Sequence, residues 1–430
     1  MSLFHHTHIS ATHGPTSSER RNRSGYFSLT QNEEDDFDPH FKPSRNELSP
    51  IDKASRFVSC VTFIVLLTLC INTFIDIRAS TSSAHKRIQN LASSLRDEMK
   101  NKKTGLNVKS ETFHLSDYFQ IDEETKVMKD LSSVTYPKGG PVIAFLTTNT
   151  TKDIDDTQTA LKSLVFLHGD VDADFLAPVL IFSEGNLKDT QKLKLAQSTN
   201  RPISFPVVDF KEFPPGLDLD ADGMKFKVKG RENLWGYHQM IRFWITRVWH
   251  HPAIEPYEII MRMDSDSCFK GVNEVLPGFL NDDIVYHSQF VGLESGSGFL
   301  TDLMDHSERF LKRYNKMAGN PMLYRYAKLT WESKKTLPLF MTNFEVSRKS
   351  FMLKNIVMRW HESLTEEKPY GVFTHRWGDA VTRYLMAAMI AMNYQLDTNY
   401  PDGYFHKEHC KREDVDRAIR EFNQLVNESD

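Results

Sequence analysis

Two acidic residues separated by one position follow a strand-like segment in the second half of the chain. Tyr257–Met263 is an apolar, β-prone run, and it leads directly into Asp264-Ser265-Asp266. In open α/β sheets, ligands bind beyond the carboxyl ends of the strands, so this run would place both carboxylates at such an end. Two carboxylates spaced in this way can ligate a hard divalent cation, which in turn binds a diphosphate. The motif alone is weak, because the same pattern also closes a strand as a solvated turn.

Three further segments carry residue types that fit such a site. Asn343-Phe344-Glu345 follows an apolar run, the segment 375–380 (HRWGDA) leads into a second one, and the segment 402–406 (DGYFH) offers an imidazole. Simpler interpretations exist for each. Glu345 can be a surface charge, and Arg376 and Asp379 can form an ion pair that caps the helix after them. The four segments together favour a functional site over these simpler interpretations.

The segments between these motifs alternate between strand-like and helix-like patterns. We expect strands in 141–149, 175–185, 201–210 and 257–263, because each is a short apolar run. We expect helices in 152–167, where apolar residues recur at helical spacing, in the polar stretch 186–198, and in the apolar stretches 237–249 and 381–392. This order is the βαβ rhythm of an α/β domain, in which helices cover a sheet of mostly parallel strands.

Taken together, these segments resemble the fungal-type Golgi α1,2-mannosyltransferases of glycosyltransferase family 15. The resemblance covers roughly residues 140–411, and both the order and the spacing of the motifs fit. The matching stretches are Tyr237-His238-Gln239-Met240-Ile241-Arg242-Phe243, Arg262-Met263-Asp264-Ser265-Asp266, Asn343-Phe344-Glu345, Arg376-Trp377-Gly378-Asp379-Ala380 and Gly403-Tyr404-Phe405-His406. The resemblance implies a GT-A-type nucleotide-sugar-binding fold, with a Rossmann-like mixed sheet flanked by helices, a manganese ion and GDP-mannose as the donor.

The resemblance also implies roles for individual residues. It makes Asp264, Asp266 and His406 the metal ligands, and imidazole with carboxylate is a ligand set suited to Mn²⁺. It makes Glu345 the catalytic residue beside the anomeric carbon. The residues that it assigns to donor or acceptor binding are Tyr237, Arg242, Arg262, Asp264, Asn343, Arg376 and Asp379. For Tyr237, packing in the core is an equally good interpretation, because aromatic stripes on helices usually belong to the core.

The chain departs from the family pattern at three positions. Some family members have Glu-Pro-Asp where this chain has Asp264-Ser265-Asp266, an acidic residue where it has His375, and Ile where it has Asp402. These differences leave the metal chemistry intact, because the carboxylates and the imidazole are retained. They leave the linkage and the acceptor open.

We therefore expect a retaining mannosyltransferase that moves mannose from GDP-mannose to a mannose-containing glycan or glycoprotein, with an α1,2 linkage. Glu345 would act either as a nucleophile or as a carboxylate that stabilises positive charge on the sugar. One alternative is a metal-dependent glycosyltransferase with another nucleotide-sugar donor. Another is a non-catalytic, membrane-anchored glycan-binding protein that keeps the fold.

The N-terminal part of the chain predicts a membrane anchor. Phe57–Ile75 carries no charge and matches the span of a bilayer core, and the long polar segment before it is unlike a cleaved signal peptide. We expect a disordered cytoplasmic tail (1–56), a transmembrane signal anchor (57–75), a lumenal stem (76–136) and a catalytic domain (137–430). The protein would then be a single-pass type II protein of the Golgi membrane with its catalytic domain in the lumen.

The overall charge of the chain bears on its possible partners. The net charge of -4, with 26% charged residues, provides no general basic field, so it does not indicate nucleic acid as a partner.

Cys60 and Cys70 fall in the predicted anchor, whereas Cys268 and Cys410 follow it. The latter two can form one disulfide in an oxidising lumen or remain two buried thiols, because connectivity cannot be deduced from sequence.

Overall fold

A computed structural model describes residues 111–122, 128–167, 176–218, 235–273, 275–278, 283–295, 298–399 and 401–427. All of them belong to one compact unit, Val108–Asp430. The predicted tail (1–56), the predicted anchor (57–75) and residues 76–110 of the predicted stem lie outside the described residues. Within the described part of the chain, no helix combines the length and the apolar character needed to cross a membrane.

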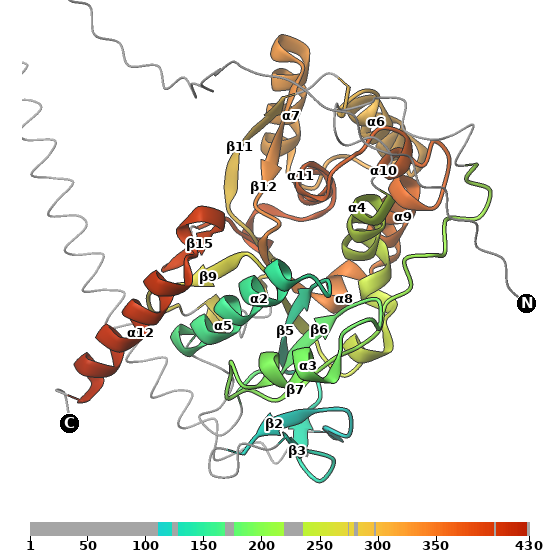
Figure 1. Ribbon diagram of the computed structural model, residues 1–430. Coiled ribbons are helices and arrows are strands. Elements are labelled where there is room, and N and C mark those ends of the chain that lie inside the picture. The colour runs from blue at the N-terminus through green and yellow to red at the C-terminus, as the bar shows by residue number, and fades with distance from the viewer. Residues whose placement is uncertain are drawn as a thin grey trace, which may run out of the picture. The chain divides into compact units, whose positions relative to one another are not determined.

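A nine-stranded mixed sheet forms the centre of the unit (Figure 1). In spatial order its strands are β14 (Leu396–Asp397), β10 (Tyr286–His287), β13 (Phe344–Arg348), β8 (Ile259–Met263), β5 (Pro141–Leu146), β6 (Val179–Phe182), β7 (Ile203–Ser204), β2 (Phe119–Ile121) and β3 (Met128–Asp130). Strands β8, β5, β6 and β7 are parallel, whereas β13 is antiparallel to β8. The predicted α/β domain with a mixed sheet is confirmed.

Three two-stranded sheets complete the strand pairing among the described residues. They are β1 (Thr112–His114) with β4 (Thr135–Pro137), β11 (Phe290–Ser295) with β12 (Thr336–Phe340), and β9 (Ser267–Phe269) with β15 (Tyr404–His406). Strands β1 to β4 precede or end at residue 137, where we expect the catalytic domain to begin, and β2 and β3 extend the central sheet at one edge.

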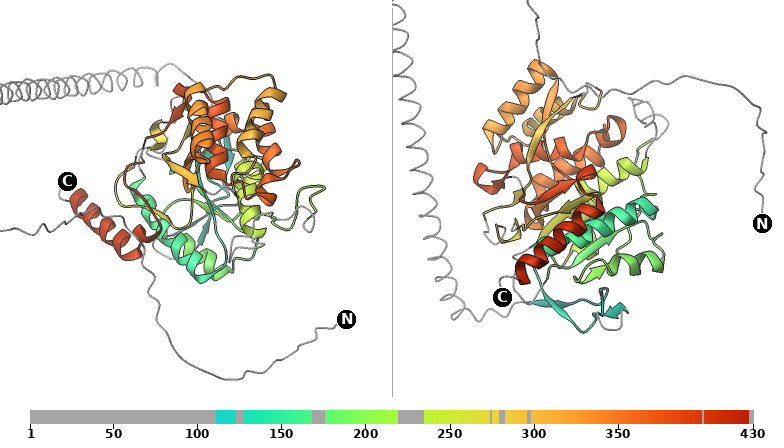
Figure 2. Two further views of the ribbon diagram at one scale, coloured as in Figure 1. Left: turned by 90° about the horizontal axis from the view of Figure 1, so that it is seen from above. Right: turned by 60° about the vertical axis from the view of Figure 1, so that its left-hand side comes forward.

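Helices cover both faces of the central sheet, and each face has its own hydrophobic cluster. One face packs against α2 (Thr151–Ser163), α3 (Asp189–Ala196), α5 (Val275–Gly278) and α12 (Arg412–Asn427). The opposite cluster includes α4 (Trp235–Arg242), α6 (Leu303–Arg313), α7 (Pro321–Lys334), α8 (Lys349–Met352), α9 (Asn355–Thr365), α10 (Gly371–Thr374) and α11 (Asp379–Ile390). Helices α2 and α12 lie side by side, as Figure 2 shows.

Two predicted elements are shorter or less regular than their patterns indicate. The helix predicted over 237–249 is α-helical only to Arg242, continues as a π-helical segment, Phe243–Arg247, and ends in a 3₁₀ turn. The strand predicted over 201–210 is reduced to Ile203–Ser204. Pro202 and Pro206 bracket that strand, and since proline lacks an N–H group, neither can donate to a sheet ladder.

Candidate active site

Strand pairing brings Arg262 and Glu345 to the same face of the sheet. Strand β13 pairs with β8 so that Glu345 lies opposite Arg262. Side chains alternate along a strand, and the neighbours of Arg262, Met261 and Met263, belong to the cluster on the α2 face. Arg262 and Glu345 therefore point toward the other face, where α11 and the segment after α4 lie. Both side chains are buried.

The guanidinium of Arg262 contacts three carboxylates. Its Nη1 lies 2.7 Å from Oδ2 of Asp379 and 3.5 Å from Oε1 of Glu345, and its Nη2 lies 3.2 Å from Oδ1 of Asp264. The guanidinium also stacks on the ring of Trp244, 4.6 Å from the centroid. With Arg383, which contacts Glu345, two buried guanidinium groups face three carboxylates, and this unequal ratio suits a site that binds a further cation.

Asp379 is the first residue of α11. The dipole of the helix stabilises a negative charge at this end, and the backbone N–H of Ala380 donates to Oδ1. Burial acts to raise the pKa of the Asp379 carboxyl, but the charge and hydrogen bond of Arg262 outweigh it and lower this pKa below its ordinary value. Asp379 is therefore an anion at neutral pH.

Asp264 lies where β8 ends, as the sequence predicts. Its backbone N–H donates to the carbonyl of Asn343 at 2.9 Å, which ties this turn to the residue before β13. Burial raises the pKa of the Asp264 carboxyl above its ordinary value, and Arg262 offsets only part of that rise. Oδ1 of Asn343 is buried without a hydrogen-bond partner among the described residues. A buried acceptor without a partner indicates a place for a donor group of a ligand.

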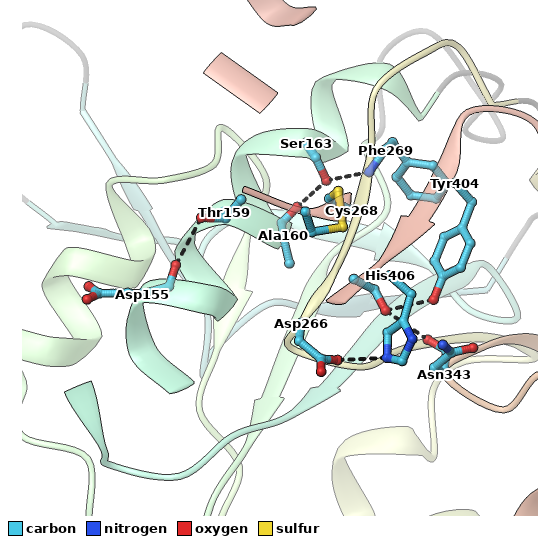
Figure 3. The surroundings of a disulfide bond; sticks show 12 residues. Asp155, Thr159, Ala160, Ser163, Asp266, Cys268, Phe269, Asn343, Tyr404 and His406 are labelled. Atoms are coloured by element: carbon cyan, nitrogen blue, oxygen red, sulfur yellow. Dashed lines mark hydrogen bonds and ion pairs between the residues drawn. A yellow bond between two sulfur atoms is a disulfide. The ribbon is translucent and has the colours of Figure 1, made fainter. Parts of the chain in front are cut away.

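Asp264, Asp266 and His406 form a cluster that can hold a metal ion. One ligand atom from each lies within 4.8 Å of the others. His406 comes from β15, which pairs with β9 so that His406 lies opposite Ser267. The Nε2 atom of His406 lies 3.1 Å from Oδ1 of Asp266, and Figure 3 shows the two groups facing each other.

Two local features hold β15 against β9. A disulfide joins Cys268 to Cys410, which answers the question that the sequence left open. Gly403 has φ of +67°, and a Cβ at this position would lie 2.5 Å from the carbonyl oxygen of Gly271. Only glycine fits this turn without strain. The turn and the disulfide bring His406 to Asp266 across a long separation in sequence.

The donor set of this cluster fits manganese, because two carboxylate oxygens and an imidazole nitrogen suit Mn²⁺. All three residues are partly exposed, so a metal ion there can still bind a ligand from solvent. A cavity of about 330 Å³ adjoins Asp266. Its lining includes the basic residues Lys152 and Lys407 and the acidic residues Asp156 and Glu408, and Lys152 forms an ion pair with Asp156.

Tyr237 and Arg376 contact each other near the start of α11. Nη2 of Arg376 lies 3.4 Å from the Tyr237 hydroxyl, and the guanidinium lies 4.5 Å from the centroid of the Phe299 ring. Arg376 has φ of +59°, a conformation that non-glycine residues seldom adopt and that often occurs at functional sites. Arg376 precedes Asp379 by three residues, so this pair lies close to the cluster around Arg262.

Arg242 does not join this cluster. Its side chain is 1% exposed and forms a bidentate ion pair with Glu366, with both N–O distances at 2.6 Å. Its Nη1 also donates to the carbonyl of Glu212. The contacts of Arg242 therefore tie α4 to the end of α9 and to the loop around residue 212, away from the other predicted binding residues.

Sequence analysis missed three buried residues that contact Glu345 directly or through one other residue. They are Tyr286, Arg383 and His361. A signal for Arg383 was available, because it is the single charged residue in the apolar run 381–392 and follows Asp379 by four positions, which is one helical turn. Tyr286 and His361 have no comparable signal.

A model of the glycolipid 2-alpha-mannosyltransferase family matches residues 86–427. The chain is 20% identical over 269 residues to the Saccharomyces cerevisiae protein named probable mannosyltransferase KTR4, in an alignment that covers 58% of each chain. It therefore spans less than two thirds of that relative.

Two further comparisons agree with the first. The chain is 25% identical over 288 residues to the Schizosaccharomyces pombe protein named O-glycoside alpha-1,2-mannosyltransferase homolog 2, covering 58% of this chain and 73% of that one. The crystal structure of core-mannan synthase A from Aspergillus fumigatus, in its Mn/GDP form, matches with a TM-score of 0.53 at 19% identity, covering 61% of this chain and 74% of that chain. At this identity, the structural match supports the fold alone.

Proposed function

This chain belongs to the glycolipid 2-alpha-mannosyltransferase family, glycosyltransferase family 15, and we propose that it transfers mannose from GDP-mannose to a mannose-containing glycan or glycoprotein. The observation that carries the proposal is the continuous contact from the metal cluster through Arg262 to Glu345. One end of this arrangement suits a diphosphate, and the other offers a buried carboxylate for the sugar. A nucleotide-sugar bond would lie between them.

We propose manganese as the cofactor, held by Asp264, Asp266 and His406. When bound, it supplies Lewis-acid stabilisation of the charge on the diphosphate. The manganese and GDP in the core-mannan synthase structure support this choice.

In the proposed reaction, the bond between C1 of mannose and the diphosphate oxygen breaks, and its electron pair leaves with GDP. A new bond forms between C1 and the oxygen of an acceptor hydroxyl, whose proton passes to the departing phosphate. Arg262 places a positive charge between Asp264 and Glu345, because its guanidinium contacts both. Asp379 keeps Arg262 in place through its 2.7 Å contact.

We propose net retention at C1, with Glu345 below the sugar ring. Glu345 either forms a covalent bond to C1 that the acceptor then displaces, or stabilises positive charge on C1 while the acceptor attacks from the same face. Burial excludes water from the carboxylate and strengthens either effect. The name of the Schizosaccharomyces relative supports an α1,2 linkage.

The proposal includes a membrane location. We propose that Phe57–Ile75 anchors the protein in the Golgi membrane and that the catalytic unit faces the lumen. Protease treatment of sealed Golgi vesicles tests this topology. Protection of the catalytic unit until detergent is added supports it, whereas cleavage of that unit in intact vesicles contradicts it.

The test of the enzymatic proposal is donor turnover by the purified full chain in detergent. GDP-mannose is compared with UDP-linked sugars, with simple mannosides as acceptors, in the presence of Mn²⁺ or of a chelator. We expect turnover of GDP-mannose alone, lost with chelator and restored by Mn²⁺. Turnover of a UDP-sugar would replace the donor, and a folded chain that turns over no donor would contradict the proposal.

A further inference from the structure

The two carboxylate oxygens of Glu345 are held unequally. The hydroxyl of Tyr286 donates to Oε2 at 2.8 Å, and Nε of Arg383 donates to the same oxygen at 3.2 Å. Oε1 contacts Nη1 of Arg262 at 3.5 Å, which is longer than a charge-assisted hydrogen bond. One oxygen is therefore fixed by two donors, whereas the other is held loosely.

Each nitrogen atom of the Arg383 guanidinium has a partner. Nη1 lies 2.9 Å from Nε2 of His361, and Nη2 donates to the carbonyl of Trp244 at 2.7 Å. Arginine has no acceptor atom, so Nε2 of His361 must accept this bond and the imidazole must be neutral. In agreement, burial and then the charge of Arg383 lower the pKa of His361 well below its ordinary value.

The strand that carries Tyr286 and the helix that carries Arg383 also hold other parts of the site. Tyr286 is on β10, which pairs with β13, the strand that carries Glu345. Arg383 follows Asp379 by one turn of α11, so a single helix sets Asp379 against Arg262 and Arg383 against Glu345. Trp244 contacts both arginines, one with its ring and the other with its carbonyl.

We propose that Tyr286 and Arg383 are positioning residues that lock Oε2 of Glu345 and so make Oε1 the oxygen that faces C1 of the donor sugar. His361 completes the arrangement by orienting Arg383. This inference rests on the proposed function, and it applies whether Glu345 forms a covalent bond or stabilises charge. Both roles need one oxygen aimed at C1, and a small error in its position slows the reaction strongly.

A purely structural role for the same contacts makes a different prediction. If Tyr286 and Arg383 only satisfied a buried carboxylate, their loss would lower stability and leave the turnover number of the folded enzyme unchanged. A positioning role predicts a lower kcat with donor affinity retained. The split between kcat and KM, together with GDP binding, therefore separates the two interpretations.

The first variant is Tyr286→Phe, which removes one hydroxyl and keeps the ring. A hydrogen bond to a charged group is strong enough for kcat to fall about 10- to 100-fold. We expect KM for GDP-mannose and GDP affinity by calorimetry to stay within about twofold of wild type. The matched control is Tyr384→Phe, because Tyr384 is an equally buried tyrosine whose hydroxyl donates to the carbonyl of Leu323 instead. It should keep the wild-type kcat.

A second pair of variants tests the role of Arg383. Arg383→Lys keeps the charge but cannot reach Oε2, His361 and the Trp244 carbonyl together, so kcat should fall while GDP binding is retained. His361→Gln keeps an acceptor for Nη1 and should recover most of the kcat that His361→Phe loses. Melting temperatures establish that each variant is folded before its kinetics are compared.

The outcomes separate this inference from the proposed function. If wild type turns over GDP-mannose and Tyr286→Phe keeps its kcat, or if Tyr384→Phe loses as much, the positioning role is wrong and the proposed function stands. If folded wild type turns over no GDP-mannose, the proposed function fails and this inference fails with it. A selective fall in kcat for Tyr286→Phe and Arg383→Lys supports both.

Discussion

Two buried arginines of this protein, Arg242 and Arg262, meet carboxylates in different proportions. Arg242 has one carboxylate partner, Glu366, which it contacts through two nitrogen atoms, and its third nitrogen donates to a backbone carbonyl. Arg262 shares one guanidinium among Asp264, Glu345 and Asp379, and its Nε is buried without a partner among the described residues. The charges of the first pair balance, whereas the carboxylates of the second group outnumber its cations.

The balance of charges around a buried arginine separates a structural ion pair from a functional one. A matched ion pair has no remaining capacity, so its loss should be seen in stability. Three carboxylates face two buried cations, Arg262 and Arg383, and an excess of carboxylates costs stability unless a metal or substrate neutralises it, so it indicates a site that is built for binding. The family resemblance alone does not make this distinction, because it includes Arg242 and Arg262 alike.

The largest effect is expected at the centre of the Arg262 group. Glu345→Gln removes the charge of the carboxylate and keeps its shape, so kcat should fall by about 1,000-fold or more because transition-state charge is no longer stabilised. GDP affinity should change little, whereas the melting temperature should fall, because Arg383 loses its carboxylate partner. Steady-state kinetics and calorimetry with GDP measure both. A variant with appreciable turnover would contradict the assignment of Glu345.

The second effect should appear only in stability. Arg242→Met leaves Glu366 charged and unpaired, and removing one partner of a buried pair costs about 3 to 5 kcal/mol. Glu366 is 23% exposed, so the lower end of that range is expected. Denaturant unfolding measures the loss, and the double variant Arg242→Met/Glu366→Leu should recover much of it. If the folded Arg242→Met enzyme instead shows a raised KM for the donor, Arg242 contacts substrate and the comparison fails.

The third prediction concerns the disulfide beside the cluster of Asp264, Asp266 and His406. The double variant Cys268→Ser/Cys410→Ser opens a disulfide that spans 142 residues of sequence. We expect a loss of about 2 to 4 kcal/mol in unfolding free energy. We also expect weaker Mn²⁺ binding, because Asp266 directly precedes β9, His406 ends β15, and the disulfide links β9 to the segment just after β15. Electron paramagnetic resonance titration of Mn²⁺ measures this binding, and unchanged affinity would mean that strand pairing alone organises the ligands.

These contrasts also explain which parts of the site were predictable from sequence. The strand end at Asp264 and the helix after Asp379 follow from local apolar patterns, and the structure confirms both. The contact of Arg262 with Glu345 depends on the antiparallel register of β13 and β8, which no local pattern encodes. The partner of Arg242 was equally hidden, because Glu366, the residue after α9, is 124 positions away in the sequence. The position of a residue in a strand or helix could be predicted from sequence, whereas contacts between residues of different elements could not.

The smallest effect concerns His238, one helical turn before Arg242 on α4. Its Nδ1 lies 2.6 Å from the carbonyl of Val372, and burial lowers its pKa to about 4. Below pH 6.5 the unfolded chain binds a proton at this residue that the folded chain does not bind. Stability present at neutral pH is therefore lost as pH falls from 6.5 toward 4, by about 1 to 2 kcal/mol at pH 5.

Unfolding of His238→Asn at pH 7 and pH 5 measures this contribution. The asparagine keeps a donor for the Val372 carbonyl and does not titrate, so the stability of the variant should depend less on pH than that of wild type by the amount given above. His409→Asn is the control, because the side chain of His409 is 67% exposed, and it should retain the wild-type pH dependence. If His238→Asn keeps the wild-type pH dependence, protonation of His238 does not oppose folding, and α4 is held by the Arg242 pair without a contribution from this imidazole.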